Sequence, residues 1–400
     1  MRFLCILSIF LMAGPVWGAK KVTVAELDDM LKTMQAEKKT DADVATTLKQ
    51  VELSEELTRG RMNELAGYAP GPLTTEQIYV LEARSATLPP PPEEIPASPA
   101  PDVSALKAIL DRAGAYATQI FAQLPEISAT KTTLRFQDNV EAVDSSAGLK
   151  GSAKEVTVGS SFVAPYQFIH YINATAHPVV IDRGVEKKSN EKDATRWGAN
   201  GYIKIQEPEP GLGEVFKAAQ ASGSIEWLRW ELVNARPAAV FSFSVPRKES
   251  KLEIDVCCFP ELSEIGVGRF YTPTTGGALA GSEATPGVSG AAGDLQTNAD
   301  WKDFKSITAF HGRLYIDPDT GIVVRMIVEA ELKTSDVVRR MDTRIDYGPV
   351  KVGQRTLIMP VKSFIISVVV PSGESGAAAY STRTTLFTSE YSDYKAGTAK

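Results

Sequence analysis

The chain has 400 residues, of which 43% are hydrophobic and 23% are charged, the proportions of a soluble globular protein. This length leaves room for one large domain or two ordinary ones. The formal net charge of −6 and the lack of a basic stripe argue against nucleic acid as a partner. After residue 18 no apolar run is long enough to cross a bilayer, so we expect no transmembrane anchor in the mature chain.

Residues 1–18 have the three parts of a secretory signal peptide. Arg2 supplies the positive start, and the apolar run from Phe3 to Met12 is short for a membrane span. Val16 and Gly18 then stand at the −3 and −1 positions of a cleavage site. We therefore expect cleavage near Gly18 and a periplasmic or secreted protein.

Residues 19–87 are expected to form a bundle of short helices that packs against another part of the chain. Thr23 with Glu26, and Thr74 with Gln77, have the spacing of capping boxes, and the second would begin a helix that runs to about residue 87. Three sets of apolar residues have helical spacing. The first predicted helix has Leu27, Met30, Leu31 and Met34, the second has Val44, Leu48 and Val51, and the third has Leu53, Leu57 and Leu65.

Residues 88–101 include seven prolines and predict an extended, polyproline-like linker. Asp102 then caps a long amphipathic helix that Pro125 ends. Its apolar stripe consists of Leu106, Ile109, Leu110, Ala113, Ala117, Ile120, Phe121 and Leu124.

After this helix the apolar pattern changes to a period of two, which is typical of strands with one buried face. The alternating stretches lie at residues 241–245, 252–258, 314–316, 322–330 and 340–347. Residues 364–370 are apolar on both faces apart from Ser367, so we expect both faces of that strand to be covered. The order of elements predicts an α+β domain over 102–400, in which a curved antiparallel sheet packs on the long helix.

Two loops lie within this domain. Residues 272–299 are rich in Gly, Ala, Ser and Thr, and we expect a flexible surface insertion there. Asp317, Pro318 and Gly321 have the positions of a turn between two strands, whereas a calcium loop would need a different glycine position and a distal glutamate.

Catalytic motifs are absent from the sequence, since neither H-E-x-x-H nor G-x-S-x-G occurs. We interpret His170, His177 and His311 as satisfied or exposed side chains, with a converging zinc site as the alternative. Accordingly, we expect no catalytic residue, no metal and no cofactor.

Cys257 and Cys258 are the only cysteines outside the signal peptide, which excludes a disulfide-stapled scaffold. Neighbouring side chains on a strand point to opposite faces, so we interpret Cys258 as a buried small hydrophobe and Cys257 as a partly covered thiol. The alternative is a redox or thiol-dependent site at this pair.

Four side chains are candidates for contacting an apolar ligand. Trp227 and Trp230 are expected on opposite faces of one strand, one in the core and the other lining a groove or capping an open edge. Phe364 and Ile366 are the candidates on the two-faced apolar strand.

The stretch from about residue 305 to 370 resembles outer-membrane lipoprotein-sorting (lipoprotein carrier-like) proteins. There a strand ends in Asp-Pro-x-Thr-Gly, as at residues 317–321, and returns with a basic residue such as Arg325. Residues 346–350, Gly353 and residues 357–362 resemble a later segment of that fold. There a strand containing Tyr leads to a Gly turn and then to a strand entered at Pro, here Pro360. The whole chain also resembles a group of uncharacterised exported bacterial proteins with an N-terminal helical segment, a Pro-rich spacer and a Cys-Cys strand.

The resemblance implies a half-open barrel closed over helices, whose apolar concave face receives lipid chains. The helix from Asp102 to Leu124 would fill that face. Residues 20–87, 88–101 and 272–299 have no counterpart in the compact carriers.

These observations predict a non-enzymatic, exported envelope protein that binds an apolar ligand, a lipid or a lipoprotein acyl chain, or else a protein partner. The alternative is an interaction or sensor module that docks an envelope protein through its N-terminal helices. A thiol-dependent enzyme that uses Cys257 is a third hypothesis.

Overall fold

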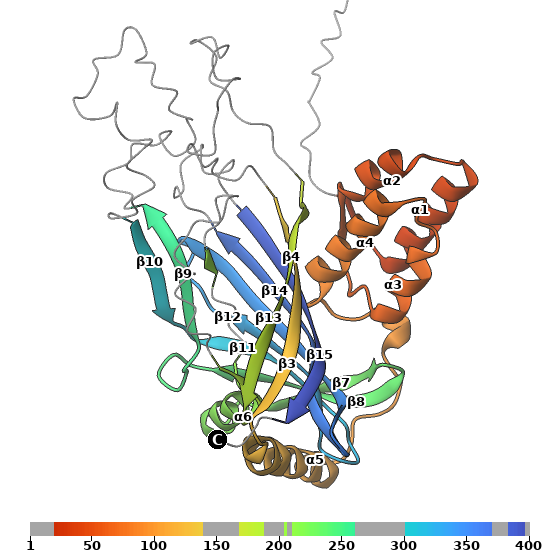
Figure 1. Cartoon of the computed structure of the whole chain (residues 1–400). Helices are drawn as coiled ribbons and strands as arrows, with labels where there is room; N and C mark the ends of the chain where they lie inside the picture. Colours follow the sequence, from red (N-terminus) through yellow and green to blue (C-terminus); the bar gives the residue numbers. More distant parts are fainter. Residues whose placement is uncertain are drawn as a thin grey trace, which may run out of the picture.

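The computed structural model describes residues 20–138, 168–187, 204–205, 210–260, 301–369 and 383–396. The predicted signal peptide and the 272–299 insertion lie outside these residues. A large antiparallel sheet of ten strands dominates the fold, and helices cover parts of both its faces (Figure 1). The prediction of an α+β protein built on an antiparallel sheet is therefore confirmed.

The strands of the large sheet lie in the order β5-β4-β3-β15-β14-β13-β12-β11-β8-β7, so the sheet is open and ends at β5 and β7. In that order their bounds are Val185–Glu186, His170–Asp182, Ile127–Gln137, Arg383–Ala396, Arg355–Val369, Val338–Val352, Val323–Ala330, Phe310–Ile316, Arg236–Val245 and Glu226–Val233. A smaller sheet contains β10 (Trp301–Ile307), β9 (Glu253–Pro260) and β6 (Lys204–Ile205). The alternating stretches predicted as strands lie in these elements, except that Leu252 and Ile322 stand one residue before β9 and β12.

The N-terminal residues form a helical module, which we define as residues 20–87. It contains α1 (Val24–Ala36), α2 (Asp41–Leu48), α3 (Arg59–Ala66) and α4 (Pro72–Ser85) around an apolar core of its own. The capping box of α1 is confirmed, because the Thr23 hydroxyl accepts from the Glu26 amide and the Glu26 carboxylate accepts from the Thr23 amide. This module therefore has local sequence signals for its helices and a separate core.

Two predictions within the helical module are wrong. Val51 and Leu53 do not belong to helices but lie in β2 (Val51–Leu53), which pairs in parallel with β1 (Lys20–Val22), and Leu57 lies in the loop before α3. The second capping box does not form, because α4 begins two residues before Thr74, at Pro72. Its first amides are instead satisfied by the Asp41 carboxylate of α2, 3.0 Å from the Leu73 nitrogen and 2.8 Å from the Thr74 nitrogen.

The linker of residues 88–101 lies against the rest of the protein at its start. Pro90 and Pro91 are buried, the Glu56 amide donates to the Pro89 carbonyl at 2.7 Å, and a short 3-10 turn, η1, forms at Pro92–Glu94. The chain then runs without regular structure to Asp102, whose carboxylate caps α5 (Val103–Ala115) as predicted.

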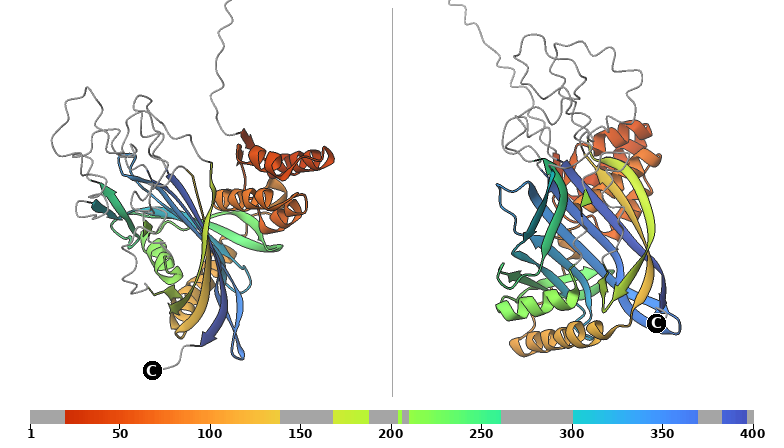
Figure 2. Two further views of the ribbon diagram at one scale, coloured as in Figure 1. Left: turned by 45° about the horizontal axis from the view of Figure 1, so that its top comes forward. Right: turned by 60° about the vertical axis from the view of Figure 1, so that its left-hand side comes forward.

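The predicted long helix consists of three consecutive helical segments. After α5 the chain continues as a π-helical turn, η2 (Tyr116–Ile120), and a 3-10 turn, η3 (Phe121–Gln123). A further helix, α6 (Leu212–Ser222), packs beside them and was not predicted. The two views of Figure 2 show α5 and α6 on one face of the large sheet and the helical module on the other. We call these faces the inner and the outer face.

The turn predicted at residues 317–321 is confirmed. The Asp317 carboxylate accepts from the amides of Asp319 and Thr320, and Gly321 has a φ of 76°, which favours glycine. An Arg112 guanidinium nitrogen donates to the Pro318 carbonyl at 2.6 Å, so the turn also anchors α5. These residues form a structural turn that holds a helix.

Candidate functional site

The inner face is covered by the chain's own helices. Ile109 and Phe121 from the predicted long helix and Phe216 from α6 are at most 4% exposed. They pack in one cluster with residues from six strands of the large sheet, and representative members are Phe241, Ile316, Met326, Ile345, Ile365 and Phe387. The stripe of the amphipathic helix therefore packs on the sheet, as the sequence predicts.

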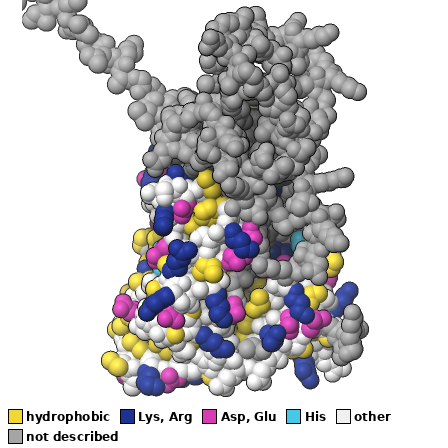
Figure 3. All heavy atoms as spheres, turned by 90° about the vertical axis from the view of Figure 1, so that its left-hand side faces the viewer, with side chains coloured by type: hydrophobic (Ala, Val, Ile, Leu, Met, Phe, Trp, Pro, Cys, Tyr) yellow, Lys and Arg dark blue, Asp and Glu magenta, His cyan; other side chains and the backbone are white. Residues whose placement is uncertain are grey.

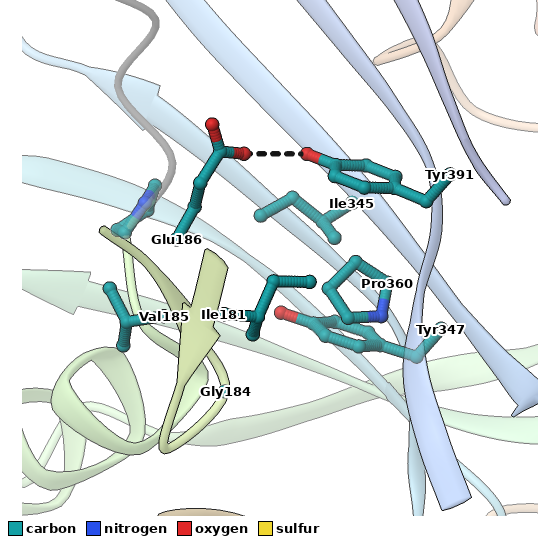
Figure 4. A pocket seen from close by; sticks show the side chains of 9 residues that line it. Ile181, Gly184, Val185, Glu186, Ile345, Tyr347, Pro360 and Tyr391 are labelled. Carbon is teal, nitrogen blue, oxygen red and sulfur yellow. Dashed lines mark hydrogen bonds between the residues drawn. The ribbon is translucent and has the colours of Figure 1, made fainter. Parts of the chain in front are cut away.

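A small hollow remains on the inner face at the turn between β4 and β5 (Figure 4). Its lining residues are Ile181, Gly184, Val185, Glu186, Pro210, Ile345, Tyr347, Pro360 and Tyr391. Its volume of about 10 Å³ suits one water molecule. At its polar side the Glu186 carboxylate accepts from Lys131 Nζ and from the Tyr391 hydroxyl, each at 3.2 Å.

Gly184 explains why this hollow is small. It has a φ of 76°, and a Cβ built on it would come within 1.9 Å of the Phe121 ring. The ring therefore sits directly on the β4–β5 turn, and it also meets Tyr347 edge to face at 5.7 Å between ring centroids. Phe121 thus closes the space that a larger ligand would need.

The outer face carries a buried ion-pair network under the helical module. Glu56, which is 1% exposed, contacts Arg344 Nη1 at 2.6 Å and Arg325 Nη1 at 3.2 Å. Asp346, on β13, contacts Arg344 Nη2 at 2.8 Å and Arg325 Nε at 2.7 Å. Opposite charges surround each group, which a buried ion pair requires. The network therefore joins a loop of the module to β12 and β13.

Further contacts extend the network along the outer face. Lys362 on β14 pairs with Glu82 on α4 at 2.7 Å, and both are at most 5% exposed. Arg313 donates to the Thr87 carbonyl, and Arg340 donates to the Thr87 hydroxyl at 3.2 Å. The helical module is thereby fixed to the sheet by charged contacts at the C-terminal end of α4.

The pKa of Asp346 reflects this environment. Burial acts to raise the pKa of Asp346, but Arg325 and Arg344 outweigh it and hold that pKa below its ordinary value. On the same face, burial raises the pKa of Tyr315 to about 12, so its hydroxyl keeps its proton at neutral pH. At neutral pH Asp346 therefore stays ionised and Tyr315 stays protonated.

We expect the Asp346 contribution to stability to depend on pH. Because its pKa is lower in the folded than in the unfolded state, the contribution is fully present above about pH 4 and is lost as the pH falls through the folded pKa. Thermal melts of the parent and Asp346→Asn from about pH 6 to about pH 3 test this. The difference in melting temperature between the parent and the variant should shrink as the pH falls. A difference that stays constant over this range would contradict the assignment.

The structure places Phe364 and Ile366 on the outer face, buried under the helical module. Both are 2% exposed and pack under α4 against its Val80 and Ala83. Ile365, between them, belongs to the inner cluster. The prediction that both faces of this strand are covered is therefore confirmed, and the helical module is what covers the outer one.

Trp227 and Trp230 lie on the same face, so the expectation of opposite faces is wrong. Their ring centroids are 5.1 Å apart, with an angle of 74° between the rings. The register of β7 with β8 shifts between Trp227 and Arg229, so a bulge at Leu228 adds one residue to the strand. Because of the bulge, Trp227 and Trp230 pair with residues only two apart on β8, so both side chains point to the same face. Both rings pack at the edge of the inner cluster.

Cys257 and Cys258 lie in β9 as predicted, and their side chains fall outside the described residues. His311 is exposed beside Glu329 and Glu331, at 3.6 Å and 3.5 Å. Within the described ranges no three His, Cys, Asp or Glu side chains are grouped to hold a metal ion.

On the face shown in Figure 3, basic and acidic side chains are interspersed over the described surface. In the part of the chain that the structure describes, no helix has the length and apolar character needed to cross a bilayer. Comparison with models of protein families, with curated proteins and with solved structures found no match.

Proposed function

We propose that the chain is an exported, non-enzymatic binding protein of the cell envelope, with a half-open barrel that serves as a scaffold. The observation that carries this proposal is the occupied inner face, where Ile109 and Phe121 fill the position that a lipid chain would take in a carrier. Binding then falls to surfaces outside the sheet, and we propose a protein partner rather than an apolar ligand.

The size of the hollow supports this choice. Binding sites for small molecules have volumes of about 300–1,000 Å³. The hollow has about 10 Å³, and the Phe121 ring packs against two of its lining residues, Gly184 and Tyr347. An acyl chain could enter there only if Phe121 and the helices attached to it moved away.

A fatty-acyl probe tests the proposal. Purified, delipidated protein should show no saturable uptake of the probe at tens of micromolar, while a thermal melt shows that it is folded. Saturable uptake by the folded protein would contradict the scaffold function and would favour the lipid carrier instead.

The filled inner face also predicts the effect of a buried charge. Ile109→Asp should destabilise the protein by several kcal/mol, because an unpaired carboxylate would be buried among apolar side chains. Val103→Asp is the matched control, since Val103 lies on the same helix and is 84% exposed. Chemical denaturation of both variants measures the difference, and equal stability of the two would show that α5 faces an open space.

The helical module offers a surface for a partner, which supports the interaction module as a second candidate function. A shallow, mostly apolar groove of about 440 Å³ runs between α1 and α2. Met30 and Met34 line it, and Asp29 and Lys39 are among its polar residues. Methionine adapts to varied partners, and a groove between helices suits an amphipathic helix.

Photo-crosslinking in cells tests the groove. A photoreactive residue at Met34 should give a discrete adduct that Met30→Asp removes, whereas the same residue at exposed Lys107 on α5 should give none. An identical adduct pattern at both positions, or none at Met34, would count against docking through the helical module.

A further inference from the structure

The end of the linker contacts Trp230, one of two tryptophans on the edge strand of the large sheet. Trp227 and Trp230 are on β7, the last strand of the sheet, and meet edge to face. The indole nitrogen of Trp230 donates to the Pro99 carbonyl at 2.9 Å. A proline-rich segment is thus bound to one ring of an aromatic pair, through the indole N–H of Trp230.

The linker has the chemistry that such an aromatic surface recognises. Pro96, Pro99 and Pro101 each fix φ near −65°, and each also restricts the preceding residue to extended conformations. Residues 95–101 therefore favour the polyproline II conformation, in which backbone carbonyls have no internal hydrogen bonds. Such segments bind aromatic-lined surfaces at a small cost in conformational entropy.

Residues 95–101 of the linker are bound weakly to the tryptophans. Pro99 is exposed and both indoles are only partly buried. One hydrogen bond of this kind changes an equilibrium by about fivefold. The two ends of the segment are fixed more firmly, by buried Pro91 on one side and by the Asp102 cap of α5 on the other. Residues 95–101 can therefore leave the indoles while α5 and the helical module stay in place.

We infer that Trp227 and Trp230 form a recognition site for a proline-rich, extended peptide, which the chain's own linker occupies and which a proline-rich segment of a partner protein can take over. The site lies at the β7 edge, away from the groove of the helical module. It goes beyond the proposed function and stands whether or not that groove binds a partner.

A labelled peptide with the sequence of residues 89–102 tests this site by fluorescence anisotropy. The protein should carry Pro96→Ser, Pro99→Ser and Pro101→Ser, which weaken the competing linker at exposed or partly exposed positions. This variant should bind the peptide with saturation and at least about fivefold more tightly than the parent does. Adding Trp230→Phe, which keeps a ring but removes the N–H donor, should weaken binding about fivefold.

The control peptide has alanine at every proline, with the same length and charge. If the folded linker variant does not bind the proline peptide, or binds the alanine peptide equally well, the inference is wrong. The unmodified protein gives a second measurement. Excess proline peptide should shift the indole N–H resonance of Trp230, and the alanine peptide should leave it unchanged; no difference between the peptides would overturn the inference.

Discussion

A fragment that lacks residues 20–101 should aggregate or fail to melt cooperatively. The deletion removes the cover of the outer face and exposes an apolar surface that includes Phe136, Phe364, Ile366 and Leu386. It also removes Glu56 and Glu82, the partners of three buried cations. Large exposed apolar patches on a sheet promote aggregation. Size-exclusion chromatography and thermal melting of the fragment measure the outcome.

The control for this deletion is the full chain cut once by a protease at an engineered site within residues 95–98. The cut breaks the same connection but leaves the helical module on the sheet, so the two-piece protein should stay folded and associated. If the deleted fragment instead melts cooperatively at the parent's temperature, the helical module is a separate domain and not part of the core.

Glu56→Ala should lower the free energy of unfolding by about 3–5 kcal/mol, as expected when one member of a buried ion-pair network is removed. The substitution leaves Arg325 and Arg344, both at most 7% exposed, with Asp346 as their one remaining partner in the network. The loss in the free energy of unfolding is large because Arg325 and Arg344 stay buried with only one carboxylate to balance their two positive charges. Chemical denaturation of the parent and the variant measures it.

Glu52→Ala is the matched control, in the same module. Glu52 pairs with Arg84 at 3.7 Å, and its side chain is 44% exposed. An exposed pair of this kind contributes about 0–1 kcal/mol. Equal losses for the two variants would contradict the assignment of a buried network at Glu56.

Local signals in the sequence predicted most of the elements correctly. The period-two stretches lie in strands, Asp102 and Thr23 cap helices, and the turn at Gly321 forms as its residue types require. These features depend on neighbours within a few residues. The α6 helix was missed although its signal is present, because Leu212, Val215, Phe216 and Ala219 have helical spacing and Gly223 ends the helix in a left-handed conformation.

The candidate sites depended on contacts that no local pattern contains. Glu56 is 269 residues from Arg325 and 288 from Arg344, so their pairing follows only from the packing of the module on the sheet. The same packing covers Phe364 and Ile366. Trp227 and Trp230 share a face because of a bulge at Leu228, and residue types at that position do not specify an inserted residue.

Native-state hydrogen exchange of α5 tests the central claim most directly, because the proposed scaffold requires this helix to stay on the inner face. The amides of residues 109–117 should exchange as slowly as those of β13 and β14, since they belong to the same packed core. The exchange should not change when a fatty-acyl probe is added. Fast exchange across the whole of α5, or protection that changes with the probe, would show a mobile helix over a ligand site and would contradict the scaffold.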